Sequence, residues 1–214
     1  MRTDEELRKL VHAELAWDPR ITSDAVEAEV RQGIVTLSGH VGSYSEKLAV
    51  ERATERVGGV KGVVVKLNVR HEAPHTDEAL ALAARSALQW YVHVPAEDLQ
   101  LEVEDGCVTL RGHVQWGFQR RTAESAVSHI RGVRGVRNDI VVLPKLVPEE
   151  VEGKIEVALR RHAEREAQHI KVKASAGVVT LEGKVGTLAE RRAAAGAAWS
   201  APGVSEVINH LQVR

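Results

Sequence analysis

One short pattern occurs three times in this chain, and the repetition restricts the folds that the sequence can adopt. The pattern G-x-V-T-L-x-G-x-V stands at residues 33–41, 106–114 and 177–185, so successive copies are 73 and 71 residues apart. The same spacing relates the Gly-Val pairs that begin at residues 59, 132 and 203. Because separated matches share one offset, we expect three homologous modules, at residues 1–72, 73–146 and 147–214.

The first half of each module has the pattern of a helix followed by a hairpin. In the first copy, Leu7 and Leu15 belong to an apolar series with i, i+3, i+4, i+8 spacing, which predicts an amphipathic helix. Thr3 with Glu6 resembles a capping box at the start of this helix. Apolar and polar side chains then alternate over residues 26–41 on either side of a glycine turn, which predicts a β-hairpin.

The second half of each module predicts another helix and a third strand. In the first copy the helix covers residues 43–57, with Leu48, Ala53 and Val57 on its inner side, and alternation over 63–69 indicates the strand. Each module therefore has the order αββαβ and the fold class α+β. We expect a mixed three-stranded sheet with both helices packed on its one apolar face, while the other face stays polar.

The repeated glycines have a structural explanation. Gly33 and its equivalents supply the positive φ of a hairpin turn, and Gly39 and its equivalents allow a close backbone or helix approach. Their spacing matches neither a P-loop nor a dinucleotide fingerprint.

Composition and charge exclude several classes of protein. The chain has 29 basic and 30 acidic residues, so a net charge of -1 provides no global field for nucleic acid, and we predict no nucleic-acid partner. The single cysteine, Cys107, rules out an internal disulfide. The first residues are charged and lack the apolar core of a secretory signal, and no apolar run approaches a transmembrane segment. We therefore expect a cytoplasmic protein.

Candidate catalytic and metal-binding residues do not form a recognisable constellation. His40 and His113 occupy equivalent positions, but Lys184 replaces them in the third copy, so a shared metal site is disfavoured. Cys107 stands where the other copies have Ile34 and Val178, which indicates a small hydrophobic residue and not a nucleophile. We expect no metal, no cofactor and no enzymatic activity.

A basic turn distinguishes the middle module. Arg131, Arg134 and Arg137 lie at three-residue spacing among glycines, and Arg120 and Arg121 on the preceding helix could add to them. Guanidinium and backbone N–H groups can bind phosphates or other anions. The alternative interpretation is a solvated helix-to-strand turn.

Aromatic residues are scarce and give a second candidate. Trp17 and Trp90 are equivalent residues at the end of the first helix, and we expect them to pack in the core or between modules. Trp116 and Phe118 begin the second helix of the middle module, where a membrane-interface or protein contact competes with local packing. A helix of about fourteen residues would place them roughly 20 Å from the basic turn.

The combined motifs resemble the BON domain, which occurs in bacterial osmotic-stress, envelope and nodulation-related proteins. A second pattern, G-V-x-x-V-x-N-x-[LI]-x-V, stands at residues 132–142 and 203–213, and Val65 replaces its Asn in the first module. The resemblance covers all three modules. It implies non-enzymatic modules that interact with phospholipids or with the cell envelope.

Two functional hypotheses follow from the sequence and the resemblance. The first is a binding or scaffolding protein of the stress response, with anionic phospholipid or a protein as its partner. The alternative is a structural assembly protein, in which polar sheet faces or edge strands join copies into homo-oligomers.

Overall fold

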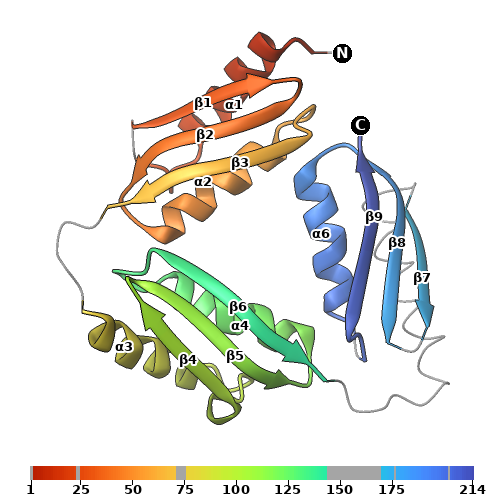
Figure 1. Ribbon diagram of the computed structural model, residues 1–214. Coiled ribbons are helices and arrows are strands. Elements are labelled where there is room, and N and C mark those ends of the chain that lie inside the picture. The colour runs from red at the N-terminus through yellow and green to blue at the C-terminus, as the bar shows by residue number, and fades with distance from the viewer. Residues whose placement is uncertain (1, 23–24, 71–75, 144–169, 176, 202) are drawn as a thin grey trace. The chain divides into compact units, whose positions relative to one another are not determined.

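Three α+β units make up the described part of the chain, as the prediction of three repeated modules requires (Figure 1). The structure, a computed structural model, describes residues 2–22, 25–70, 76–143, 170–175, 177–201 and 203–214. Each unit has its own three-stranded sheet in the order in which the strands follow in the chain.

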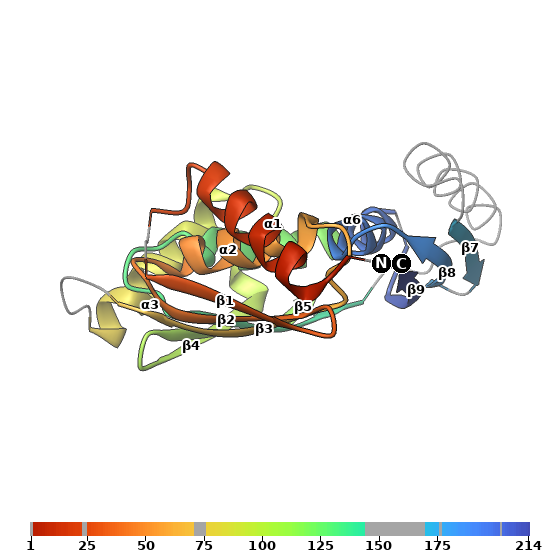
Figure 2. The same cartoon turned by 90° about the horizontal axis from the view of Figure 1, so that it is seen from above.

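The first module has the predicted αββαβ order. Its elements are α1 (Asp4–Trp17), β1 (Val26–Arg31), β2 (Ile34–Val41), α2 (Tyr44–Arg56) and β3 (Gly62–Val69). Strand β2 pairs antiparallel with β1 and parallel with β3, so the sheet is mixed. Both helices cover one face of this sheet (Figure 2).

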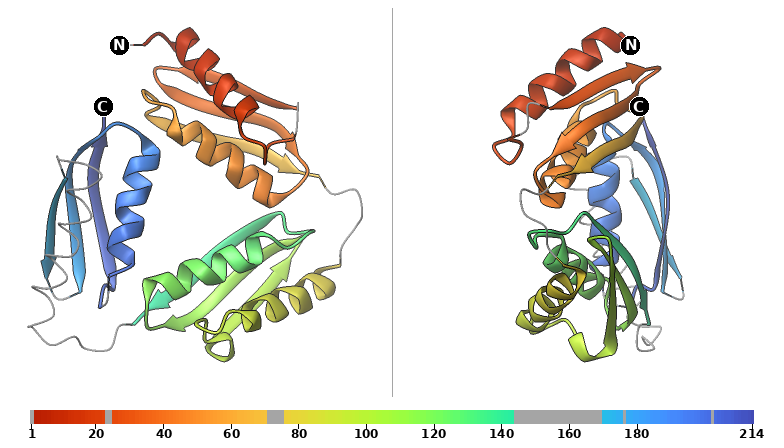
Figure 3. Two further views of the ribbon diagram at one scale, coloured as in Figure 1. Left: turned by 180° about the vertical axis from the view of Figure 1, so that it is seen from behind. Right: turned by 60° about the vertical axis from the view of Figure 1, so that its left-hand side comes forward.

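The described parts of the other two modules follow the same order of elements. The middle module consists of α3 (Asp77–Trp90), a short 3-10 helix η1 (Ala96–Asp98), β4 (Leu99–Glu104), β5 (Cys107–Val114), α4 (Gly117–Ser128) and β6 (Gly135–Val142) (Figure 3). The third contains β7 (Ile170–Ser175), β8 (Val178–Val185), α6 (Leu188–Trp199) and β9 (Glu206–Val213). The first helix predicted for the third copy lies outside the described residues.

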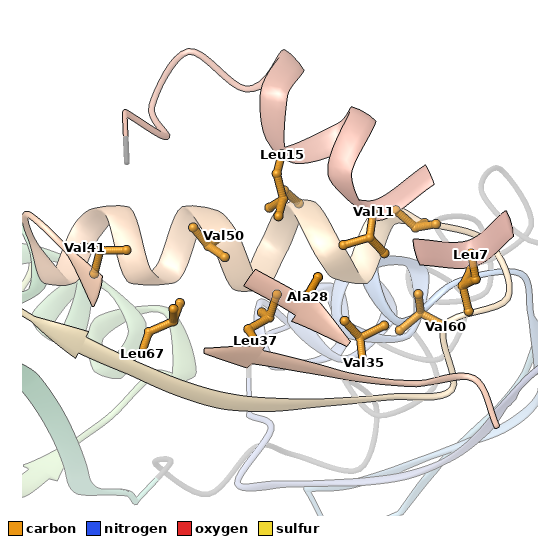
Figure 4. Close-up of a cluster of buried hydrophobic side chains, with 12 residues drawn as sticks. Leu7, Val11, Leu15, Ala28, Val35, Leu37, Val41, Val50, Val60 and Leu67 are labelled. Carbon is orange, nitrogen blue, oxygen red and sulfur yellow. The ribbon is translucent and has the colours of Figure 1, made fainter. Parts of the chain in front are cut away.

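The core of the first module lies between the two helices and the sheet. Leu7 and Leu15 of α1, Leu37 of β2 and Val50 of α2 are all buried and belong to one cluster between the helices and the sheet (Figure 4). The inner side of α2 differs from the prediction in one respect. Leu48 is only half-buried, whereas Val50 is fully buried, because Val50, Ala53 and Val57 share one side of the helix at i, i+3, i+7 spacing and Leu48 lies on another side.

Both predictions for the repeated glycines agree with the backbone. Gln32 and Gly33 have φ values of 53° and 80°, so the two-residue hairpin turn has positive φ at both positions, which is typical of a type I′ turn. Gly39 has a φ of 114°, and a Cβ atom there would collide with the carbonyl oxygen of Ala25. This collision is a physical reason for glycine late in the second strand.

An aspartate at the start of the first helix holds the hairpin turn, a contact that the sequence patterns did not predict. The Asp4 carboxylate accepts hydrogen bonds from the backbone N–H groups of Gln32, at 2.8 Å, and Gly33, at 3.1 Å. In the middle module, Asp77 accepts from the two turn amides of the β4–β5 hairpin, both at 2.9 Å. One side chain thus connects the helix to the far end of the sheet.

Candidate functional site

Five apolar and aromatic side chains are exposed at one end of the middle module, and we call them the aromatic tip. They come from the end of α3 and the start of α4, where no strand of the sheet buries them. Trp90 is 84% exposed and Val92 is 91% exposed. The members of the aromatic tip are Trp90, Tyr91, Val92, Trp116 and Phe118.

The backbone of the aromatic tip is fixed by Gln119 and His93. The Gln119 Nε2 atom donates to the carbonyl oxygen of His93 at 2.7 Å, and its Oε1 atom accepts from the N–H groups of Gln115 and Trp116, both at 3.0 Å. The imidazole ring of His93 lies edge-on to the ring of Phe118, with 6.2 Å between the ring centroids. The loop after α3 is therefore tied to the start of α4, so the exposed side chains are held on an ordered backbone.

The solvent side of α3 extends this apolar surface. Leu82 is 70% exposed and stands where α1 has Lys9, and the exposed Ala79 stands where α1 has Glu6. A helix of a small domain normally presents charged side chains to water. The middle module departs from this rule on the helix that ends in Trp90.

The basic turn lies at the opposite end of α4, as predicted. Arg131 and Arg134 are exposed in the turn between α4 and β6, and α4 itself is 12 residues long. At 1.5 Å per residue the turn is therefore roughly 18 Å from the aromatic tip. Arg137 points from the open face of β6, where it forms an ion pair with Asp139 at 2.8 Å. The three arginines thus do not converge on one point.

One of the two arginines of α4, Arg120, has a structural role inside the middle module. The Arg120 Nη2 atom donates to the carbonyl oxygen of Asn138 at 3.1 Å, and the Asn138 Nδ2 atom donates back to the Arg120 carbonyl at 3.0 Å and to Glu124 at 2.9 Å. Arg121 is half-buried. Asn138, the asparagine of the second motif, therefore holds α4 on β6. The sequence showed that this asparagine recurs but gave no role for it.

The prediction that Trp17 and Trp90 pack in a core is wrong, because they are 85% and 84% exposed. Each is the last residue of its helix. Their surroundings differ between the modules. Trp17 is followed by the buried Asp18, which accepts two hydrogen bonds from Arg20, at 2.9 and 2.6 Å. These bonds hold the pKa of the Asp18 carboxyl well below its ordinary value, against the opposing effect of burial.

The described part of the chain contains neither a candidate metal site nor a candidate membrane span. Among the described residues, no group of three His, Cys, Asp or Glu side chains is close enough to hold a metal ion. No helix in the same part of the chain is long and apolar enough to cross a membrane. Cys107 is exposed at the start of β5, and His113 is exposed on the same open face.

Comparison with known proteins identifies the modules. The profile of the BON domain matches three ranges of this chain, residues 3–71, 76–144 and 149–214. The chain belongs to the BON domain family. The matched ranges include the described elements of all three modules.

One curated relative of this BON protein is the osmotically-inducible protein Y of Escherichia coli (strain K12). The two are 30% identical over 143 residues, which cover 64% of this chain and 71% of that protein. Two solved structures are of CdsD, a structural protein of the type III secretion system of Chlamydia trachomatis. The first is 15% identical to this chain, and the match covers 100% of both chains. The second is 16% identical, and the match covers 98% of this chain and 92% of the CdsD chain. Their TM-scores are both 0.28, too low for a conclusion about this chain. Neither the description of the family nor the name of the curated relative mentions a catalytic activity.

Proposed function

We propose that this BON protein is a non-enzymatic binding protein that attaches to phospholipid surfaces through the aromatic tip of its middle module. One observation carries the proposal: Trp90, at the end of α3, and Val92, on the ordered loop that follows, are almost fully exposed. Exposed apolar patches on small domains mark interaction sites. Tryptophan and tyrosine also suit the boundary between headgroups and acyl chains, because each has an apolar body and a polar group.

The magnitude of the apolar contribution supports reversible binding. Transfer of one large apolar side chain from water to an apolar environment contributes about 1.5–3 kcal/mol. Trp90 and Val92 can contribute most of the free energy of transfer of the aromatic tip, since they are its most exposed members. Because the loop is already fixed by Gln119, little ordering entropy opposes the contact.

Anionic headgroups would add a smaller, salt-dependent contribution from the basic turn. Arg131 and Arg134 can reach the same surface only if α4 lies along it, and Arg137 already pairs with Asp139. Replacing all three arginines with Gln should therefore weaken binding to anionic vesicles at low salt and have little effect at high salt. Equal binding of the triple variant and the wild type at low salt would show that the basic turn makes no headgroup contact.

Similarity to an osmotically-inducible protein supports a role in the response to osmotic stress. In this proposal the chain binds a membrane whose lipid packing changes with osmotic conditions. The cytoplasm stays our prediction for its compartment, and fractionation of cells that express the native gene tests it.

Vesicle flotation tests the proposal, and the repeat supplies a matched control. We expect the wild type to float with vesicles of phosphatidylglycerol and phosphatidylethanolamine, and the double variant Trp90→Ser, Val92→Ser to remain at the bottom. Trp17→Ser removes the equivalent, equally exposed tryptophan of the first module, but it should leave flotation unchanged because the residues after it, Asp18 and Arg20, are charged. Absence of flotation by the wild type would refute lipid binding and favour self-assembly, the alternative hypothesis.

A further inference from the structure

The edge strands of the first and third modules carry opposite charges at equivalent positions. Strand β1 lies at one edge of its sheet, and β7 lies at one edge of the described sheet of the third module. The open face of β1 presents Glu27 and Glu29, and that of β7 presents Lys171 and Lys173, all four exposed. Each lysine stands at the position of one of the glutamates, 144 residues further along the chain.

The backbone of each edge has hydrogen-bonding groups available for another strand. Arg31 is paired with Ile34 next to the two-residue turn. Because hydrogen-bonded pairs alternate along an antiparallel ladder, the backbone N–H and C=O groups of the odd-numbered residues of β1 point toward β2. The N–H and C=O groups of the even-numbered residues, including Ala28, consequently face the open edge. The same holds for β7, where Ser175 is the turn-closing residue and Val172 faces the edge. Within the described residues, no strand pairs with either edge.

One antiparallel register satisfies both the backbone and the charges. With Ala28 opposite Val172, Glu27 lies opposite Lys173 and Glu29 lies opposite Lys171. The ion pairs then occupy the sites without ladder hydrogen bonds, where facing side chains approach most closely. Ala28 and Val172 are both buried on the helix side of their sheets, so the apolar faces of the two sheets remain on the same side.

We propose that β1 of one copy of this chain pairs with β7 of a second copy, in this register, to form a continuous six-stranded sheet. The contact joins two different surfaces, so it is heterologous and leaves a free β1 and a free β7 at the ends. It therefore builds rings or linear chains of molecules, with an association constant that decreases as salt is added. This inference does not depend on lipid binding by the aromatic tip.

The charge pattern also disfavours pairing between identical edges. A symmetric β1–β1 pair would place Glu27 opposite Glu29, and a β7–β7 pair would place Lys171 opposite Lys173; like charges directly opposite are destabilising. Edge charges usually protect sheets from such pairing. Here they protect against identical edges and leave the complementary pair.

The edge strand β4 of the middle module is a weaker competitor for β7. It also carries glutamates, but Glu102 already forms an ion pair with Arg111 of β5 at 2.7 Å. By contrast, Glu27 and Lys171 form no ion pair with another described residue, and the Glu29–Arg31 pair is longer, at 3.7 Å, and largely solvated. Lys173 would have to share its ammonium group with Glu182, which now contacts it at 3.1 Å.

Sedimentation velocity of the full chain at low ionic strength tests the proposal with charge-reversal variants. We expect the wild type to associate as its concentration rises. Two double variants reverse the charges of one edge each: the first carries Glu27→Lys and Glu29→Lys, and the second carries Lys171→Glu and Lys173→Glu. Each should associate at least about tenfold more weakly than the wild type, because two attractive pairs become repulsive. The matched control Glu102→Lys, Glu104→Lys reverses the same charges on β4 and should associate like the wild type. Circular dichroism of every variant shows that it is folded.

Mixing the two charge-reversed proteins separates pairing between copies from all alternatives. A mixture contains complementary edges only on different molecules, so association should return to the wild-type level. If the mixture stays monomeric while a single chain with all four reversals regains compactness, β1 pairs with β7 of the same molecule and the proposal is wrong. A monomeric wild type at all concentrations, or loss of association in the β4 control alone, also overturns it.

Discussion

Replacement of Asp18 by Asn should destabilise the first module selectively. The Asp18 carboxylate is 96% shielded from water and accepts hydrogen bonds from Arg20 and, at 3.1 Å, from Arg56, which also pairs with Glu14 at 2.7 Å. These contacts connect the end of α1 to the following loop and to the end of α2. The middle module has Tyr91, a residue without this network, at the position of Asp18.

The expected loss follows from the number and exposure of these bonds. An asparagine keeps one acceptor but loses the charge on bonds that are each worth about 1.5–3 kcal/mol when a charged group takes part. Both arginines remain partly exposed, at 57% and 40% of their side chains, so water recovers part of this energy. We therefore expect a net loss of about 2 kcal/mol in the free energy of unfolding of the first module.

Hydrogen exchange followed by mass spectrometry measures this loss module by module. At pH 7 the slowest amides of β2 should exchange about thirtyfold faster in Asp18→Asn than in the wild type, and those of β5 should be unchanged. The control Glu14→Gln removes only the more exposed partner of Arg56, which is 34% exposed at its side chain, and should change exchange by less than about fivefold.

The pH dependence provides the refuting result. The pKa of Asp18 is lower in the folded state than in the unfolded chain, so its stabilisation is complete above the ordinary value near pH 4 and declines as pH falls toward the folded-state pKa. After correction for intrinsic exchange rates, the difference between wild type and Asp18→Asn should be constant from pH 8 to 5 and smaller at pH 3. An equal difference at pH 7 and pH 3 would refute the role assigned to this carboxylate.

Three further experiments test the local structure. In a thermal melt, Gly39→Ala should strongly destabilise the first module, because an added Cβ would collide with the backbone of Ala25. Gly196→Ala should stabilise the third module by about 0.5–1 kcal/mol, because Gly196 lies inside a helix with nothing within 4 Å of an added Cβ. Equal effects of the two substitutions on stability would contradict this contrast. Asn138→Ala should cost about 1–3 kcal/mol in urea unfolding of the middle module, because it removes the polar contact between α4 and β6; no change in midpoint would contradict it. Asp77→Ala should accelerate amide exchange in the β4–β5 turn, and Glu78→Ala, in the same helical turn, should not.

The repeat and the alternation of side chains predicted most of the fold, because they report which face of each element is buried. They predicted the αββαβ order, the mixed sheet and the glycines of positive φ. They could not predict that Asp4 reaches the hairpin turn, since that contact depends on how the helix crosses the sheet. The position of Leu48 was wrong for a related reason: one helix with several apolar positions allows more than one choice of inner side.

The candidate site was less predictable than the fold. The sequence indicated Trp116 and Phe118, but it assigned Trp90 to a core or to a contact between modules, because large apolar residues at helical spacing are usually buried. Periodicity does not show which residues at the end of a helix remain in contact with water, and Trp90 is such a residue. The sequence also gave no reason to separate Arg120 from the basic turn, because the contact of Arg120 with Asn138 exists only in the folded module.

Insertion of Trp90 into a lipid surface is the central claim, and fluorescence of single-tryptophan proteins measures it most directly. One variant keeps Trp90 and has phenylalanine at the other three tryptophan positions, and a matched variant keeps only Trp17. With vesicles whose acyl chains carry bromine near the headgroup, Trp90 emission should shift to the blue and be quenched, while Trp17 emission stays unchanged. Flotation of the protein with Trp90 emission unshifted and unquenched would contradict the account.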